Sequence, residues 1–564
     1  MKYFVKYKNP ERHFIDFKLV VDTNDINILK LQLPSWRPGR YELGNFAKNI
    51  KDFKVFTNDG QIVNFSKINK DLWEIDCRNL QSISVQYQYY AAELNAGSTY
   101  LDQYQLYINP VNCMFYNIDN YDLGYEVEFD IPNDYQIFTS LHQSSSNILT
   151  ASNFEELADS PIVISNNSQN ESIIINGINF TLCFQGEIKV EWNKIFKDFK
   201  LFIQYQIKLF GSFPHEKFLF LFQITPYSSY HGVEHHKSTV ILLGPSYQVF
   251  NSFYTELLGV SSHELYHVWN VKNIRPKAML PYNFSGENYT DMGYVTEGVT
   301  TYMGDRILFE SGVFSQDQYF KELQKIFQRH FHNDGRKYYS VAESSFDTWL
   351  DGYISGTPGR KVSIYVEGAL IALICDAQIR KATNHKKSLH EVMKKMYSGS
   401  DKLTGYNSQK YKELLESVSG LSFDEVFKNL IYGKEDFHQY LMESLAVFGW
   451  SFKIIKHENS SWNYGFKSSL NSNTFKVINV LEDSAAFNSN LVEGDQILAV
   501  NNYNLDDNLD KWLNYFNGDD IILKISRKNE IMDLKLKKEN DIQYFNYKFF
   551  EKWQNLMLLS GYVY

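Results

Sequence analysis

The stretch that most constrains this chain of 564 residues is His263-Glu264-Leu265-Tyr266-His267, a HExxH sequence near the middle. It lies in residues 254–271, which contain no proline and have apolar residues at helical spacing, so a helix is predicted there. Side chains four positions apart share one face of a helix, and the two imidazoles can therefore bind one metal ion. Glu264 lies about 100° around the axis from His263, within reach of a water at that metal.

A third ligand would support this interpretation, because catalytic zinc usually has three protein ligands and one open position. A chance HExxH is expected on the order of once in fifty such chains, and two histidines can also simply pack on a helix face. Glu297 lies near the start of a second predicted helical run, 294–308. It would complete a set of two histidines and one glutamate if this helix packed antiparallel on the first. The alternative for Glu297 is a capping or solvated carboxylate near a helix start.

These segments resemble the glycyl aminopeptidase family of PDZ-containing gluzincin zinc metallopeptidases. The similar sequences follow one another in the family's order along nearly the whole chain. They are YHGVEHHKSTVILLG (230–244), SHELYHVWNVKNIRP (262–276), YVTEGVTTYMGD (294–305), VAESSFDTWLDG (341–352) and SIYVEGALIALICD (363–376). The resemblance implies one Zn²⁺ per chain, held by His263, His267 and Glu297, with Glu264 as the general base.

The resemblance also implies a substrate site. Gly232 and Glu234 match a strand that lies along the substrate, where the carboxylate of Glu234 would hold the free amino terminus. Tyr365 matches a tyrosine whose hydroxyl stabilises the negative charge that develops on the substrate carbonyl oxygen. Taken alone, Glu234 would be a charge in a surface loop and Tyr365 one of 40 tyrosines. Many relatives have lysine where this chain has Glu367, which leaves the local charge open.

The length predicts about three domains, and the fold class is multidomain α+β. Residues 1–170 contain short strands and predict a β-sandwich-like domain, with segments 154–161 and 165–172 as the linker out of it. In that domain, the sequence Trp36-Arg37-Pro38-Gly39 matches a family motif without assigned chemistry. Residues 171–445, starting with a strand at 173–184, predict a mostly helical, thermolysin-like peptidase domain. Residues 446–540 resemble a PDZ domain, and 541–564 form an aromatic tail predicted to dock on the body.

Composition limits the partners. The net charge is −10 without long basic runs, so nucleic acid is not expected. No apolar run approaches the roughly 20 residues that span a bilayer, and the first residues lack a secretory signal. The four cysteines are widely spaced and predict reduced thiols, so we expect a soluble cytoplasmic protein without membrane partners.

The predicted function is zinc-dependent removal of amino-terminal residues from peptides, with preference for Gly or other small residues. The predicted partners are peptides with a free amino terminus and a chain-end ligand of the PDZ domain. Two alternatives remain open from the sequence: a zinc endopeptidase with the same metal site, and a non-catalytic PDZ peptide-binding protein.

Overall fold

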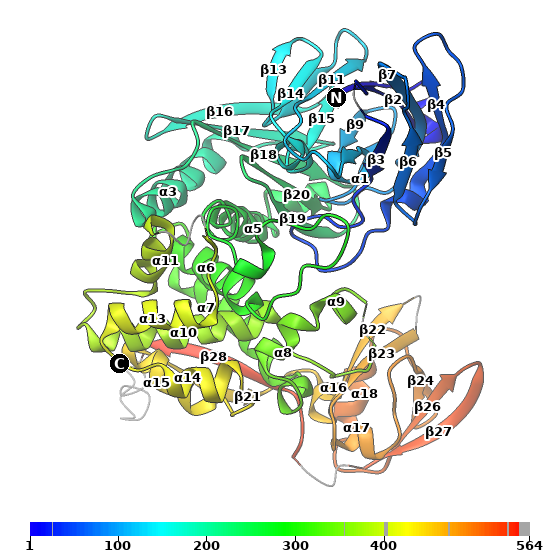
Figure 1. The fold of residues 1–564 in the computed structure, drawn as a ribbon. Coiled ribbons are helices and arrows are strands. Elements are labelled where there is room, and N and C mark those ends of the chain that lie inside the picture. Colours follow the sequence, from blue (N-terminus) through cyan, green and yellow to red (C-terminus); the bar gives the residue numbers. More distant parts are fainter. Residues whose placement is uncertain (25, 355, 400–403, 472–473, 538–540, 552–564) are drawn as a thin grey trace. The chain divides into compact units, whose positions relative to one another are not determined.

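The computed structural model describes residues 1–24, 26–354, 356–399, 404–471, 474–537 and 541–551 (Figure 1). The chain divides into two compact units. Unit 1 contains Met1–Ser315, Ser345–Ile354 and Leu389–Val418, and unit 2 contains the rest.

The N-terminal part of unit 1 is rich in β-strands, as predicted. Its largest sheet has seven strands in the order β13-β14-β11-β1-β2-β7-β4 (Figure 1). In β2, Ile15, Phe17 and Leu19 are buried while Lys18 between them is exposed, the alternation of a sheet with one covered face. The bounds are β1 (Lys2–Lys6), β2 (Phe14–Asp22), β4 (Ile50–Thr57), β7 (Ser82–Tyr90), β11 (Tyr125–Asp130), β13 (His142–Ser145) and β14 (Ile148–Ala151).

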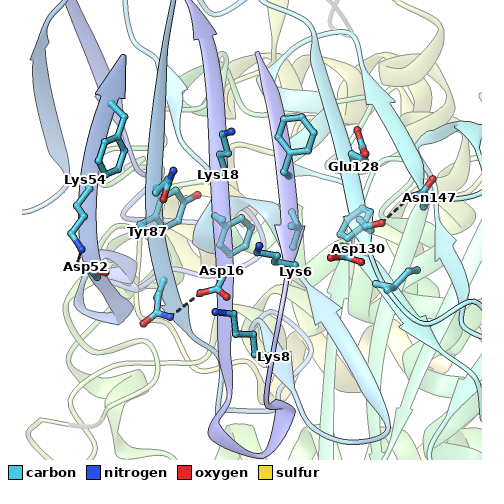
Figure 2. Close-up of a pocket in the computed structure, with 18 of the residues that line it drawn as sticks. Lys6, Lys8, Asp16, Lys18, Asp52, Lys54, Tyr87, Glu128, Asp130 and Asn147 are labelled. Atoms are coloured by element: carbon cyan, nitrogen blue, oxygen red, sulfur yellow. Dashed lines mark hydrogen bonds and ion pairs between the residues drawn. The ribbon is translucent and has the colours of Figure 1, made fainter. Parts of the chain in front are cut away.

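The other face of this sheet borders an open hollow of about 940 Å³ (Figure 2). Its lining contains both signs of charge, among them Lys6, Lys18, Asp16 and Asp130. Such mixed charge on alternate strand residues is typical of a solvated sheet face.

Two four-stranded sheets complete this β-rich part, in the orders β10-β3-β6-β5 and β12-β15-β9-β8. Phe115 packs edge-on against Trp73 and Tyr87, with ring centroids 5.1 Å apart in both pairs. The bounds are β3 (Ile28–Gln32), β5 (Phe65–Lys67), β6 (Leu72–Asp76), β8 (Tyr100–Leu101), β9 (Gln105–Ile108), β10 (Tyr116–Asn117), β12 (Gln136–Thr139) and β15 (Ile162–Ser165).

A five-stranded sheet, in the order β16-β17-β18-β20-β19, follows. Strands β17, β18 and β20 are parallel, and β19 lies antiparallel at the edge. The helix α3 (Trp192–Phe210) crosses between β17 and β18, as the amphipathic pattern of 190–208 predicts. The bounds are β16 (Gln169–Ile175), β17 (Ile178–Gln185), β18 (Lys217–Ile224), β19 (Ser229–Glu234) and β20 (Ser238–Gly244).

Two local predictions are wrong. Residues 173–184 are not one strand, because Asn176 and Gly177 have positive φ (52° and 83°) and form the two-residue turn between β16 and β17. The proposed linker 154–161 instead begins with α2 (Phe154–Ala158), whose Phe154 is buried and whose first turn is capped by the side chain of Asn153.

The remaining helices of unit 1 carry or support the histidines. Helix α5 (Tyr254–Tyr266) packs on β19, β20 and α6 (Thr300–Glu310), and α11 (Leu389–Ser398) packs on α3. A π-helical turn, η4 (Tyr294–Val299), leads into α6. Shorter or outlying helices are α1 (Pro110–Cys113), α4 (Ser246–Val249), α9 (Thr348–Asp351) and α13 (Ser408–Ser419).

Unit 2 begins with a helical layer in which α7 (Gln316–Phe331) and α15 (His438–Val447) both pack on α10 (Ile364–Ala382). The antiparallel pair β21 (Trp450–Lys456) and β28 (Phe545–Glu551) follows, with β28 against α7. The first part of the predicted aromatic tail is thus a paired strand, and residues 552–564 lie outside the described residues.

A six-stranded sheet with its own apolar core forms the rest of unit 2, with Phe466, Ile497, Leu513 and Leu523 fully buried. One edge strand of this sheet is β22, next to β23. The bounds are α16 (Ser460–Asn463), β22 (Phe466–Asn471), β23 (Thr474–Val480), α17 (Ala485–Asn488), β24 (Gln496–Val500), β25 (Tyr503–Asn504), α18 (Leu509–Tyr515), β26 (Ile521–Arg527) and β27 (Glu530–Leu536). Among the described residues, no helix combines the length and apolarity that a membrane crossing requires.

Candidate metal centre

The two histidines of the HExxH sequence lie at the C-terminal end of α5. The helix ends at Tyr266 rather than at residue 271, because the next amides form shorter turns, such as Val268 N–H to the Leu265 carbonyl at 3.0 Å. His267 is the capping residue and still has helical backbone angles, so its side chain lies on the same face as His263. The tighter turns bury Val268 and Trp269 completely.

Glu297 lies in the π-helical turn η4 and is 3% exposed. Close packing of α6 on α5 brings it to the histidines. A Cβ at Gly304 would lie 3.2 Å from the His263 Cα, so only glycine allows this approach without a shift. The Ser262 hydroxyl donates to the Gly304 carbonyl at 2.9 Å and fixes the contact. The close packing of α6 on α5 therefore has a specific cause.

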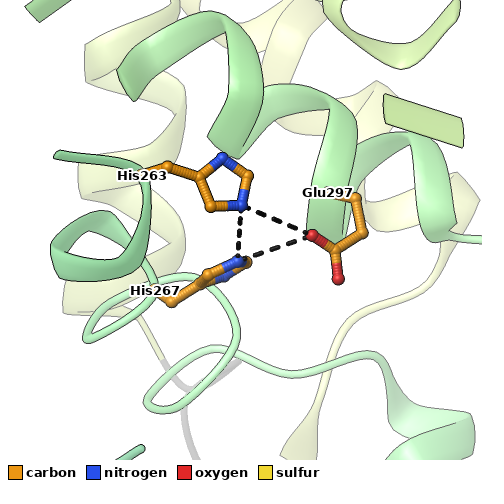
Figure 3. A group of neighbouring side chains, drawn as sticks. All are labelled: His263, His267 and Glu297. Carbon is orange, nitrogen blue, oxygen red and sulfur yellow. Dashed lines mark hydrogen bonds and ion pairs between the residues drawn. The ribbon is translucent and has the colours of Figure 1, made fainter. Parts of the chain in front are cut away.

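The structure brings His263, His267 and Glu297 together (Figure 3). The two Nε2 atoms are 3.1 Å apart, and Glu297 Oε2 lies 3.7 Å from that of His263 and 3.5 Å from that of His267. The Nδ1 of His267 lies 2.7 Å from the Asn270 carbonyl, which can only accept, so Nδ1 carries the proton and Nε2 offers a lone pair. Ligands about 2.0–2.1 Å from a tetrahedral Zn²⁺ are about 3.3 Å from one another. The spacing and chemistry of these three atoms therefore fit zinc.

The protonation states of these three side chains depend on one another. Although burial opposes it, the two histidines hold the pKa of Glu297 well below its usual range. Burial likewise opposes protonation of His267, but Glu297 raises its pKa to about 9. Burial lowers the pKa of His263. Without a cation, one imidazole thus holds a proton against the carboxylate, and a bound cation would replace that proton.

Glu264 lies beside the cluster and is 6% exposed. Its Oε2 has no hydrogen-bond partner within the described part of the chain. A Cβ at Gly232 would lie 2.1 Å from Glu264 Oε1, so β19 approaches this carboxylate where it has no side chain. Burial raises the pKa of Glu264 well above its usual range, and the neighbouring carboxylates of Glu234 and Glu297 add to this. Such a group can take up and release a proton.

Glu234, at the end of β19, is buried and forms a second carboxylate-histidine group with Glu264 and His267. His267 belongs to both groups. Because its Nδ1 contacts the Asn270 carbonyl, only its Nε2 can act as a ligand in either group, and the two groups therefore describe one site. The backbone of Gly39 lies directly against Glu234: a Cβ there would be 2.4 Å from Oε2, at a φ of +77°. The predicted substrate residues thus adjoin the predicted metal ligands.

Three residues of this site were not predicted from the sequence. The Tyr41 hydroxyl donates to Glu297 Oε1 at 3.0 Å. The Asn270 side chain donates to the Val295 carbonyl at 2.9 Å and so ties the end of α5 to η4. Arg37 is 3% exposed, and burial lowers its pKa; its Nη2 has no partner among the described residues. Arg37 lies within the Trp-Arg-Pro-Gly motif and Tyr41 two residues after it, so this motif was the sequence signal for both.

Tyr365 belongs to unit 2, whereas every residue of the cluster belongs to unit 1. It is the second residue of α10, whose first turn is capped by the side chain of Ser363. Two positions later, Glu367 is buried, and its carboxylate lies 2.6 Å from the His330 Nδ1 of α7. Glu367, the residue that departs from the family pattern, therefore forms a contact between α10 and α7 within unit 2.

Comparison with known proteins identifies the class. The N-terminal domain of M61 peptidases matches residues 2–166, and the M61 glycyl aminopeptidase domain matches residues 256–371. The second match contains His263, Glu264, His267 and Glu297, and the chain is a peptidase. It belongs to the M61 glycyl aminopeptidase family.

Solved structures give the same overall fold. An aminopeptidase N family protein from Idiomarina loihiensis is 28% identical, with 98% of each chain covered and a TM-score of 0.91. An M1 zinc metallopeptidase from Deinococcus radiodurans is 11% identical over 77% of this chain and 94% of that one, with a TM-score of 0.46, and carries no inference here. No curated protein matches the sequence.

Proposed function

We propose that this protein is a zinc aminopeptidase that removes Gly or other small residues from the amino terminus of peptides. The observation that carries the proposal is the convergence of His263 Nε2, His267 Nε2 and Glu297 Oε2 next to the buried carboxylate of Glu264. These three residues would hold one Zn²⁺ per chain. When bound, zinc supplies a Lewis acid for the scissile carbonyl and lowers the pKa of a water towards about 7.

Glu264 then acts as the general base. Its Oε2, which has no hydrogen-bond partner among the described residues, accepts a proton from the water that attacks the carbonyl carbon and then passes it to the leaving amine. Gly232 leaves room for this carboxylate, because a Cβ there would lie 2.1 Å from Oε1.

Glu234 holds the free amino terminus of the substrate through a charge-assisted hydrogen bond and so sets the position of cleavage. By family resemblance, Tyr365 donates a hydrogen bond to the carbonyl oxygen as negative charge develops on it. The small-residue preference likewise rests on the family resemblance.

A four-way comparison tests this function against endopeptidase activity: wild type and Glu234→Gln, each with a glycyl peptide and with its N-acetylated twin. Acetylation removes the ammonium group, so we expect wild type to lose about 10²-fold or more in kcat/KM, and Glu234→Gln to lose much less on acetylation. A wild type that cleaves both peptides equally would be an endopeptidase. A panel with Gly, Ala, Leu and Phe at the first position tests the size preference.

The domain assignments and the location are also proposals. We propose a β-sandwich-like domain at 1–170, a thermolysin-like domain at 171–445 and a PDZ domain at 446–540, and a cytoplasmic location in which the four buried cysteines stay thiols. The six-stranded sheet with α17 and α18 supports the PDZ assignment. Just before β22, the Tyr464 and Gly465 amides donate to the carbonyls of Ser461 and Trp462 at 3.1 and 3.0 Å, which leaves them unavailable for a chain-end carboxylate. Addition of a peptide strand along the edge strand β22 is therefore the favoured binding mode.

A further inference from the structure

Tyr41 connects the β-rich N-terminal part to the candidate metal centre. Its side chain is 5% exposed, and its hydroxyl donates to Glu297 Oε1 at 3.0 Å. Because Tyr41 occupies Oε1, the other oxygen, Oε2, is the one that faces both imidazoles. Tyr41 therefore selects which carboxylate oxygen is presented to them.

The segment that carries Tyr41, residues 35–41, is held firmly. The amides of Ser35 and Trp36 both donate to the Phe284 carbonyl, at 2.9 and 3.2 Å, and the Trp36 indole N–H donates to the Arg40 carbonyl. The Trp36 ring packs on Trp349, with ring centroids 5.5 Å apart, and Tyr41 packs edge-on against the same Trp349 ring. A side chain fixed on several sides can orient its hydrogen-bond partner at little further entropic cost.

The same segment meets the substrate side of the site. Gly39 turns the chain at a φ of +77° and lies against the carboxylate of Glu234, where no side chain would fit. One short loop thus contacts both a proposed zinc ligand and the proposed anchor of the amino terminus.

We propose that Tyr41 is a positioning residue of the metal centre, which makes the N-terminal β-rich part a working component of the peptidase site. The inference rests on the proposed zinc site. Hydrogen-bond partners of metal ligands hold the ligand in its binding orientation, and losing one typically weakens metal binding about 10–100-fold.

The test measures zinc affinity of the full-length chain by competition with a chelator, for wild type, Tyr41→Phe and a matched control, Tyr87→Phe. Tyr87 is 2% exposed, and its hydroxyl donates to the Cys113 carbonyl at 2.6 Å, so the control also loses one buried hydroxyl of the N-terminal part. We expect Tyr41→Phe to raise the zinc Kd about 10–100-fold and Tyr87→Phe to leave it within about twofold. Melting temperatures of both variants report the structural cost separately.

An unchanged zinc Kd in Tyr41→Phe, or an equal loss in Tyr87→Phe, would overturn the role of Tyr41 and leave the zinc site standing. A wild-type chain that binds no zinc would overturn both.

Discussion

Unit 1 contains two groups of charged side chains in its interior. They differ in whether other side chains of the protein neutralise their charges. In the first, Asp159 Oδ1 accepts from Lys272 Nζ at 2.9 Å and lies 3.1 Å from His235 Nδ1, while Oδ2 accepts from the His236 amide at 2.8 Å. In the candidate metal centre, the Nε2 atoms of His263 and His267 and Oε2 of Glu297 converge on one point. Side chains of the protein neutralise the first group, whereas the second has the donor set of a metal site.

The pKa shifts show the same difference. Although burial opposes it, Lys272 and His235 hold the pKa of Asp159 well below its usual range. In the metal centre the histidines likewise hold the pKa of Glu297 low, but burial raises the pKa of Glu264 well above its usual range, although His267 and Arg37 act in the opposite direction. Removing one partner of a buried charge pair costs stability, whereas converging imidazole nitrogens and a carboxylate oxygen indicate a metal ligand set. The comparison thus separates structural from functional burial of charge.

The largest expected effect lies in the metal centre. Glu264→Gln keeps the shape of the side chain and removes its ability to accept a proton, so kcat should fall about 10²–10⁴-fold. Zinc content and melting temperature should not fall, because Glu264 is not one of the three ligands. Near wild-type turnover would show that another group is the base.

Asp159→Asn should affect stability instead. It leaves Lys272 buried without its counter-charge, so the free energy of unfolding should fall by about 3–5 kcal/mol while zinc stays bound. Because the folded pKa of Asp159 is depressed, its contribution is present above the unfolded pKa, about 4, and is lost as pH falls below it. Urea unfolding at pH 7 and pH 3 measures this. A difference between wild type and variant that is the same at both pH values would contradict the assignment.

Gly232→Ala sharpens the comparison, since it disturbs the catalytic group without removing any charge. The added Cβ would displace the carboxylate of Glu264, and a misplacement of about 1 Å costs up to about 10²-fold in kcat. Its melting temperature should change little, because Glu264 can rotate away. Full activity would mean that Glu264 need not occupy its observed position. The matched variant Gly356→Ala, at a glycine without a positive φ whose Cβ would meet nothing within 4 Å, controls for glycine replacement.

The smallest effect is expected at Lys467 in unit 2, a half-buried cation that contacts a histidine and two aromatic rings. Its Nζ lies 2.9 Å from His332 Nδ1 and 4.6 Å from the centres of the Trp462 and Tyr544 rings, and burial lowers its pKa to about 8. The unfolded chain therefore binds more protons between pH 8 and 10.5, and stability should rise with pH in that window. In thermal melts, Lys467→Met should flatten this rise. Identical pH profiles would show that Lys467 is not desolvated.

The sequence predicted the parts of the site that a local pattern can encode. The HExxH spacing places His263, Glu264 and His267 on one helix turn, and the run after residue 294 predicts the helix that presents Glu297. Tyr41 escaped prediction because its partner lies 256 positions away, and no periodicity encodes such a contact.

The secondary structure, too, was predicted where a local sequence pattern encodes it and missed elsewhere. Long amphipathic or alternating segments such as α3 and β7 agree with their predicted ranges to within two residues. The hairpin at Asn176 was missed because an Asn-Gly turn within an apolar run is only two residues long. Helix α2 was missed because five residues are too few to show a helical period.

The central claim is that His263, His267 and Glu297 hold a single zinc ion, and elemental analysis of zinc-loaded, gel-filtered protein tests it most directly. We predict one zinc per chain in wild type and in Glu264→Gln, and almost none in Glu297→Ala. A wild type without zinc, or a Glu297→Ala variant that retains its full zinc content, would contradict the account.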